Sequence, residues 1–182
     1  SACAPPEPLA LGYIGGLTGR FTDLGISGLN GVRLAVEQRN ANGGIKGRAI
    51  KLLEEDDQQD PFVARIALSR LSDQKVAAII GPMTSAMAEA TLPLINQTPI
   101  VMLSPTVTSN QFSGIDDNFF RIIPATRDFV KTNAEFYFHQ KGLRRIRLIY
   151  DSRNRVYSES WLKDFNQHFA TAGGTTLDPL SF

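Results

Sequence analysis

Apolar and polar positions follow one another along the chain in a regular order of strand and then helix. Short apolar runs of strand length recur, and most are followed by a stretch with the 3.6-residue spacing of a helix. The runs expected to form strands are 9–17, 49–56, 76–82, 99–105, 118–124, 144–151 and 175–182. Several of them are apolar at successive positions, which is typical of strands buried on both faces.

The helical stretches are bounded by recognisable start and stop residues. Asp60 followed by Pro61 predicts an N-cap and a first-turn proline, and Asn42 with two glycines predicts a helix end. Pro93 should kink or shorten its helix because it lacks an N–H group. The helices expected from periodicity are 29–41, 62–74, 84–97, 125–142 and 158–174. Their expected inner faces are Leu29, Val32, Leu34, Ala35 and Val36 in the first, and Phe129, Asn133, Phe136 and Tyr137 in the fourth.

Strands that alternate with helices of this length predict an α/β fold with a doubly wound parallel sheet. The composition changes near Ile123, so we expect an N-terminal tether over 1–8, a first α/β lobe over 9–123 and a second lobe that begins at 124. Residues 124–182 hold too few strands to complete a second sheet. We therefore expect the chain to be a piece of a longer protein.

Charge and cysteine content narrow the function classes. The 19 basic and 18 acidic residues nearly cancel, so no nucleic acid is expected as a partner. No apolar run approaches the roughly 20 residues that cross a bilayer. Cys3 is the only cysteine, which excludes an internal disulfide. The start "SAC" and the Pro-rich segment after it resemble the end of a lipoprotein signal, in which Cys3 would carry the lipid. The alternative is a chance cysteine near a chain end.

Enzyme chemistry finds little support. The Gly-rich segment after the first strand contains no G-x-G-x-x-G, and no phosphate-binding G-x-x-x-x-G-K-[ST] occurs. His139 and His168 lie on predicted helices far from the hydroxyl-rich loops, and Ser85 lacks the flanking glycines of a hydrolase nucleophile. The acidic run "EEDDQQD" matches no recognised metal pattern. We expect no catalytic residue, metal or cofactor.

Small hydroxyl side chains follow two of the predicted strands. Thr84 and Ser85 open a helix after "VAAIIGP", and Thr106 and Thr108 follow the next strand. Ligands of open parallel sheets bind beyond the carboxyl ends of the strands, and a helix N-terminus favours an anion. Hydroxyl groups at a helix start are also common caps. Both interpretations remain open from these residues alone.

Several motifs, taken in order, resemble type I periplasmic binding proteins, and most of all their leucine/isoleucine/valine-binding branch. The resemblance covers nearly the whole chain. It rests on a Thr-Gly turn after the first strand, "N-x-x-GGI-x-G" at the end of the first helix, an Asp-Pro helix start, "IIGPMTSAMA", "PIVMLSPTVTS" and "FFRIIP". It implies two α/β lobes joined by a hinge that close over a small ligand.

The resemblance assigns binding roles to five residues that follow the third and fourth predicted strands. Ser85 and Thr108 match positions whose hydroxyls hold the α-carboxylate and α-ammonium groups of an amino acid. The main-chain carbonyl of Thr106 matches a further ammonium contact. Met83 and Thr84 match positions that approach the ligand beside Ser85.

Two more positions carry expectations about the ligand's side chain. Tyr157 resembles an aromatic residue that covers the ligand from the second lobe. Leu24 stands where the amino-acid-binding branch often has an aromatic residue, which leaves the shape of the pocket open. The acidic partner of the ammonium group is expected beyond Phe182.

The function implied is that of an extracytoplasmic solute-binding protein of an ABC importer. It would capture a branched-chain or related amino acid in the cleft between its lobes and deliver it to a membrane permease, from the periplasm or the cell surface. The alternative is an extracellular sensing domain of a receptor or regulator that binds an amino acid, an amide or an aromatic acid. A hydrolase that uses Ser85 is the third hypothesis.

Overall fold

The computed structural model describes residues 6–19 and 22–182, which form two compact units. The first unit comprises the described residues of Ser1–Thr106 together with Asp117–Ile122, and the second comprises Val107–Asp116 and Ile123–Phe182. Cys3, and with it the hypothesis of a lipid anchor, lies outside the described residues.

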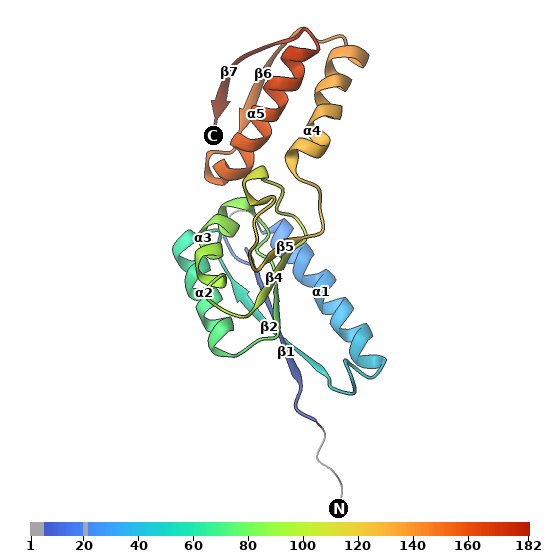
Figure 1. The fold of residues 1–182 in the computed structure, drawn as a ribbon, viewed down its shortest axis with the longest axis vertical. Coiled ribbons are helices and arrows are strands. Elements are labelled where there is room, and N and C mark those ends of the chain that lie inside the picture. The colour runs from blue at the N-terminus through green and yellow to red at the C-terminus, as the bar shows by residue number, and fades with distance from the viewer. Residues whose placement is uncertain (1–5, 20–21) are drawn as a thin grey trace, which may run out of the picture. The chain divides into compact units, whose positions relative to one another are not determined.

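The first unit is a parallel sheet of five strands in the order β2-β1-β3-β4-β5. Helix α1 covers one face of this sheet, and α2 and α3 cover the other (Figure 1). The strands are β1 (Leu9–Gly15), β2 (Ile50–Asp56), β3 (Ala78–Ile80), β4 (Val101–Ser104) and β5 (Phe119–Arg121). The helices are α1 (Asp23–Ala41), α2 (Pro61–Asp73) and α3 (Ser85–Ile95). The predicted doubly wound α/β fold is thus confirmed.

Helix α1 begins at Asp23, six residues before the predicted start. Gly25 and Gly28 favour a loop by propensity, but tertiary packing requires them inside the helix. A Cβ on Gly25 would overlap the carbonyl group of Gly16, and one on Gly28 would lie 3.0 Å from the Tyr13 hydroxyl. Glycine therefore lets α1 approach strand β1 more closely than any other residue would.

The predicted inner face of α1 is only partly right. Leu29 is buried, whereas the side chain of Leu34 is 54% exposed and Ala35 is also exposed. Val32 and Val36 are half-buried because they border a groove of about 280 Å³ beside α1. The fully buried core of this unit includes Tyr13, Ile14, Leu68, Leu71, Ile79, Ile95 and Met102.

The predicted boundaries of α2 and α3 follow from local chemistry. Asp60 accepts hydrogen bonds from the N–H groups of Phe62 and Val63 at 2.8 and 3.0 Å, and Pro61 occupies the first turn of α2, as expected. Pro93 lies inside α3, which ends two residues later at Ile95. The proline thus stands in the last turn, where the helix is already ending.

The second unit pairs two parallel strands, β6 (Arg145–Tyr150) and β7 (Thr175–Ser181). Helices α4 (Thr126–Glu135) and α5 (Arg155–Thr171) pack against each other, and α5 packs on the strands (Figure 1). A single π-helical turn (Phe136–Gln140) follows α4, and short 3₁₀ turns lie at Asn110–Phe112 and Ser152–Asn154. The core consists of Val130, Ala134, Phe165 and Phe169.

The predicted inner face of α4 is wrong at its C-terminal end. Phe136 is 37% exposed and Tyr137 is 40% exposed, whereas Val130 and Ala134 are fully buried. The buried positions Thr126, Val130 and Ala134 recur every four residues, and Phe138 continues them against the core. Phe136 comes two residues after Ala134, about half a helical turn away, so it lies off this face.

Polar contacts explain why residues 107–116 group with the second unit. The buried carboxylate of Asp164 accepts hydrogen bonds from the Asn110 amide at 2.6 Å and the Thr126 hydroxyl at 2.9 Å. The N–H of Asn110 donates to the hydroxyl of Ser160 at 3.1 Å. Buried carboxylates require such partners, so Asp164 ties this segment to α4 and α5.

Candidate functional site

The loops that follow strands β3 and β4 are hydrogen-bonded to each other. The hydroxyl of Thr106 donates to the carbonyl oxygen of Met83 at 2.7 Å, and the hydroxyl of Ser104 donates to that of Pro82 at 2.6 Å. The peptide bond before Pro82 is cis. Because β3 and β4 are neighbours in the sheet, the structure brings Met83 and Thr106 together at the carboxyl ends of two adjacent strands.

Helix α3 starts in the same place. Thr84 is its N-cap in an extended conformation, and Ser85 is its first residue, as the sequence predicted. The Thr84 side chain makes no capping hydrogen bond, so it does not play the purely structural role that the sequence left open. Ser85 is 2% exposed and Met83 is 3% exposed. The first N–H groups of a helix and the positive end of its dipole favour an anion at such a corner.

Leu24 lies in the first turn of α1, which follows the loop after β1. Its side chain is 46% exposed, in contrast to the buried Gly25 beside it. The role of Leu24 in the shape of the side-chain pocket stays a prediction. Leu24 is nevertheless not part of the first unit's buried core.

A turn rich in aspartate connects β2 to α2. Burial raises the pKa of Asp57 to about 6. A hydrogen bond from the N–H of Gln59 lowers this pKa in part, and the negative charge of Asp56 raises it further. Burial also acts on Asp56, but hydrogen bonds from Thr18, Leu17 and Gln58 outweigh it and lower its pKa. Two adjacent carboxyl groups therefore have opposite electrostatic environments.

Thr108 belongs to the second unit, unlike Thr106. Its main-chain carbonyl accepts a hydrogen bond from the N–H of Thr126 at 2.8 Å, and its side chain is 7% exposed. The sequence placed Thr106 and Thr108 on one exit loop. The structure divides that loop between its two units, with the division after Thr106.

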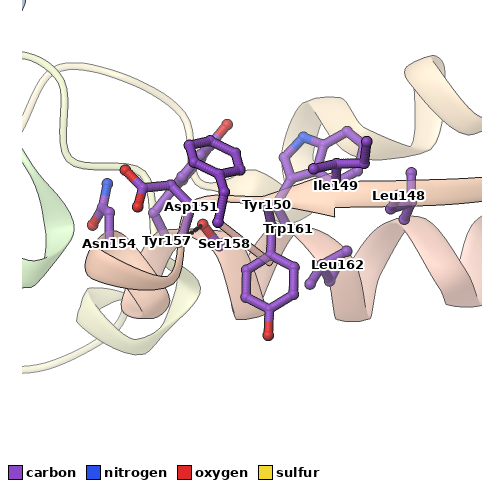
Figure 2. Close-up of a pocket in the computed structure, with 10 residues that line it drawn as sticks. Leu148, Ile149, Tyr150, Asp151, Asn154, Tyr157, Ser158, Trp161 and Leu162 are labelled. Atoms are coloured by element: carbon purple, nitrogen blue, oxygen red, sulfur yellow. Dashed lines mark hydrogen bonds between the residues drawn. The ribbon is translucent and has the colours of Figure 1, made fainter. Parts of the chain in front are cut away.

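Tyr157 borders a cavity of about 450 Å³ in the second unit. Figure 2 shows Tyr150 at the end of β6 and Tyr157 and Trp161 one turn apart on α5, all at this cavity. Polar groups of Asp151, Asn154 and Ser158 lie at the same cavity, near the start of α5. The Ser158 hydroxyl donates to the main-chain carbonyl of Asp151 at 2.9 Å.

Burial raises the pKa of the Tyr157 phenol, which therefore stays protonated and can donate a hydrogen bond at neutral pH. An apolar, aromatic wall with a few polar groups is the usual composition of a small-molecule pocket. Sequence reasoning identified Tyr157 but missed Tyr150 and Trp161. The predicted helix began at 158, after Tyr157, so the spacing of four residues between Tyr157 and Trp161 gave no signal, whereas the observed α5 begins at Arg155 and contains both.

Within residues 6–19 and 22–182, no three His, Cys, Asp or Glu side chains gather in a way that could hold a metal ion. In the same ranges, no helix has the length and apolar character needed to span a bilayer.

The parallel sheet with polar strand exits and the second β-α-β unit define the fold of type I periplasmic binding proteins. The chain belongs to the periplasmic binding protein family, whose model matches residues 8–181. The resemblance inferred from sequence motifs is thus confirmed.

Individual relatives support the same assignment. The Leu/Ile/Val-binding protein of Escherichia coli (strain K12) is 23% identical over 154 residues, which are 84% of this chain and 42% of that protein. The substrate binding protein LivJ of the branched-chain amino acid transporter from Streptococcus pneumoniae, solved with isoleucine, has a TM-score of 0.86 and 21% identity over 96% of this chain and 49% of its own.

A third similar protein binds a different ligand. It is a solute binding protein of an ABC transporter from Rhodopseudomonas palustris BisB5, solved with 3,4-dihydroxybenzoic acid, with a TM-score of 0.84 and 16% identity over 96% of this chain and 47% of its own. At this identity the likeness concerns the fold. The chain spans less than half the length of each of these three proteins.

Proposed function

We propose that this protein is a non-catalytic solute-binding protein of an ABC importer, which captures an amino acid or a similar small carboxylate. The observation that carries the proposal is the corner at the start of α3. There Met83, Ser85 and Thr106 lie at the ends of adjacent strands beside a helix N-terminus. A carboxylate is the ligand group that such a corner favours.

Individual residues have distinct proposed roles. Ser85 grips the ligand carboxylate, with Met83 and Thr84 beside it. The carbonyl oxygen of Thr106 accepts from an ammonium group, because its hydroxyl is already engaged with Met83. In the second unit, we assign the hydroxyl of Thr108 to the same ammonium group and the phenol of Tyr157 to the ligand's side chain.

Membership of the family supports a proposal for the location and the partners. We propose that the protein works in the periplasm or at the cell surface and delivers its ligand to an ABC permease. A lipid on Cys3 and a tether over 1–8 would hold it at the membrane. The proposed lobes are 9–123 and 124–182, and Leu24 contributes from the first of them to the shape of the side-chain pocket.

An aromatic acid is the second candidate ligand. It is favoured by the cavity at Tyr150, Tyr157 and Trp161, whose rings offer flat apolar surfaces. The similar structure that contains 3,4-dihydroxybenzoic acid supports this candidate. A branched aliphatic side chain would make less contact with the same aromatic residues.

Calorimetric titration with leucine, isoleucine, valine, benzoate and 3,4-dihydroxybenzoate tests both candidates. We expect one ligand class to bind with a dissociation constant well below about 1 mM, which corresponds to about −4 kcal/mol. Ser85→Ala should weaken that binding by roughly 10- to 100-fold, because a hydrogen bond to a charged group contributes about 1.5–3 kcal/mol.

The matched control is Ser69→Ala, which removes an exposed hydroxyl from the middle of α2. It should leave the affinity unchanged. Absence of binding by all five compounds would contradict the proposal, and equal affinities of the Ser85→Ala and Ser69→Ala variants would remove Ser85 from it.

A sensing domain of a receptor or regulator has the same binding chemistry, so titration does not separate it from a transport protein. Uptake of the labelled ligand by cells that lack this protein does. A large fall in uptake supports the importer, whereas unchanged uptake together with a lost transcriptional or behavioural response supports the sensor.

A further inference from the structure

The turn between β2 and α2 is fastened to the loop that follows β1. The carboxylate of Asp56 accepts a hydrogen bond from the N–H of Leu17 at 2.7 Å and another from the Thr18 hydroxyl. The same carboxylate accepts from the N–H of Gln58 at 2.9 Å. One side chain therefore holds both the turn and the loop.

Gly16 lies in the middle of this arrangement. A Cβ on Gly16 would lie 2.9 Å from Cγ of Gln59 and 3.5 Å from Oδ1 of Asp57. Its carbonyl group is the one that Gly25 of α1 closely approaches. The turn after β2 and the first turn of α1 thus both pack on the backbone of the same residue.

The turn adopts an unfavourable backbone conformation. Gln58 and Gln59 have φ angles of 50° and 54°, in the left-handed region that residues other than glycine rarely adopt. Each of them receives a compensating hydrogen bond, since the N–H of Gln59 donates to Asp57 at 2.8 Å as that of Gln58 does to Asp56. The conformation depends on these two carboxyl groups.

Asp57 is the less satisfied of the two. Its side chain is 1% exposed, and its Oδ2 has no hydrogen-bond partner among the described residues. Among the described residues, the charge of Asp56 at the end of β2 acts on it, and the phenol of Tyr13 in β1 is in turn affected by its charge; neither group is positively charged. From α2, the N–H of the N-cap Asp60 donates only to the main-chain carbonyl of Asp57, at 2.9 Å.

The Tyr13 phenol cannot relieve the negative charge of Asp57. It donates its proton to the carbonyl oxygen of Gly25 at 2.5 Å. Burial, assisted by the charge of Asp57, raises its pKa to about 12. A buried carboxylate with an unpaired oxygen and an acidic neighbour is destabilised in its charged form.

We propose that Asp57 makes the contact between the β2–α2 turn and the loop Gly16–Thr18 sensitive to pH. This contact is more stable when the carboxyl group of Asp57 is protonated. The proposal concerns the first unit alone and does not depend on the identity of the ligand. Asp56 keeps its charge and its hydrogen bonds over the range in which Asp57 changes state, because its own pKa is lowered.

The direction of the effect follows from linkage between protonation and structure. The pKa of Asp57 is about 6 in the closed turn and returns to its ordinary value of 3.8 when the turn opens to water. Stabilisation is therefore complete below that ordinary value and is lost as the pH rises through about 6. The equilibrium constant for opening should increase about tenfold between pH 5 and pH 7.

Amide hydrogen exchange followed by NMR tests the proposal on the full chain. Protection factors, corrected for intrinsic exchange, should fall about tenfold from pH 5 to pH 7 at the amides of Leu17 and Gln59. In Asp57→Asn, which cannot titrate, they should be independent of pH. Asp60→Asn is the matched control, because residue 60 lies in the same turn, is exposed and remains a good N-cap as asparagine. In this variant the protection factors should fall with pH as they do in the wild type.

Flat protection factors in the wild type, or an unchanged fall in Asp57→Asn, would overturn the proposal. Should Asp57→Asn not fold, the unmodified protein still decides the matter through the carboxyl carbon shift of Asp57. An inflection near pH 6 supports the proposed pH-sensitive contact. An inflection close to the ordinary aspartate value of 3.8 rejects it.

Discussion

Helix α1 lies against strand β1 through glycines, whereas helix α5 lies against its strands through large aromatic side chains. Both helices cross between parallel neighbours, β1 with β2 and β6 with β7. Gly25 and Gly28 remove side chains so that backbones approach. In α5, the rings of Trp161 and Phe165 stack with their centroids 4.8 Å apart, and those of Phe165 and Phe169 stack with their centroids 5.4 Å apart.

The difference shows that one topology can be stabilised in two ways. Close backbone packing makes the first unit sensitive to any added atom, because protein interiors have little free volume. Aromatic packing makes the second unit sensitive to removed atoms, because a large side chain leaves a cavity. Adding an atom at the close contact should therefore destabilise the first unit, and removing a ring should destabilise the second.

The largest expected effect is in the aromatic unit. Phe165→Ala should lower the free energy of unfolding of the second unit by about 3–5 kcal/mol, since the side chain is fully buried between two rings. Urea denaturation followed by fluorescence of Trp161, the only tryptophan, measures it. Phe136→Ala, at a site that is 37% exposed, should cost less than about 1 kcal/mol. Equal costs would contradict the packing described for α5.

A smaller effect of opposite origin is expected in α1. Gly25→Ala should destabilise the first unit by about 1–3 kcal/mol, because its Cβ would overlap the carbonyl group of Gly16. Gly31→Ala is the matched control, since a Cβ there meets nothing within 4 Å. It should stabilise the helix by about 0.5–1 kcal/mol. Denaturation followed by circular dichroism compares the two, and a shared sign would refute the close approach of α1.

The smallest effect distinguishes the helix caps of the two units. Asp60→Ala should cost about 1 kcal/mol, because Asp60 accepts two hydrogen bonds at the start of α2. Asn154→Ala, at the N-cap of α5, should cost less, since Asn154 makes no side-chain capping bond. Thermal unfolding of both variants measures the difference. A larger loss of stability from Asn154→Ala than from Asp60→Ala would show that side-chain capping hydrogen bonds do not decide the contribution of these two caps.

Local chemistry explains most of what could be predicted about the fold. The order of strands and helices, the Asp60 cap and the start of α3 follow from periodicity and end signals. The early start of α1 could not be predicted in this way, because Gly25 and Gly28 oppose helix formation on their own. The exposure of Phe136 depends on which face of α4 packs against α5, and the several aromatic residues near its end did not identify that face in the sequence.

The candidate site also contains residues that the sequence predicted and residues that only the structure revealed. Hydroxyl residues at two strand exits were visible in the sequence, and the structure joins their loops through Thr106 and Met83. In the sequence, Asp57 was only one member of the acidic run "EEDDQQD", and its burial was not predictable. Tyr150 and Trp161 became recognisable only once β6 and α5 were seen to border one cavity.

By itself, the sequence determined the succession of elements, the parallel α/β class and the family, because these depend on residues near one another or on motifs in a fixed order. The tertiary structure alone decided which residues far apart in the chain meet. It placed Gly25 on Gly16, buried Asp57 beside a second carboxylate and tied residues 107–116 to Asp164. These outcomes depend on packing and desolvation, which arise only when distant segments exclude water from one another.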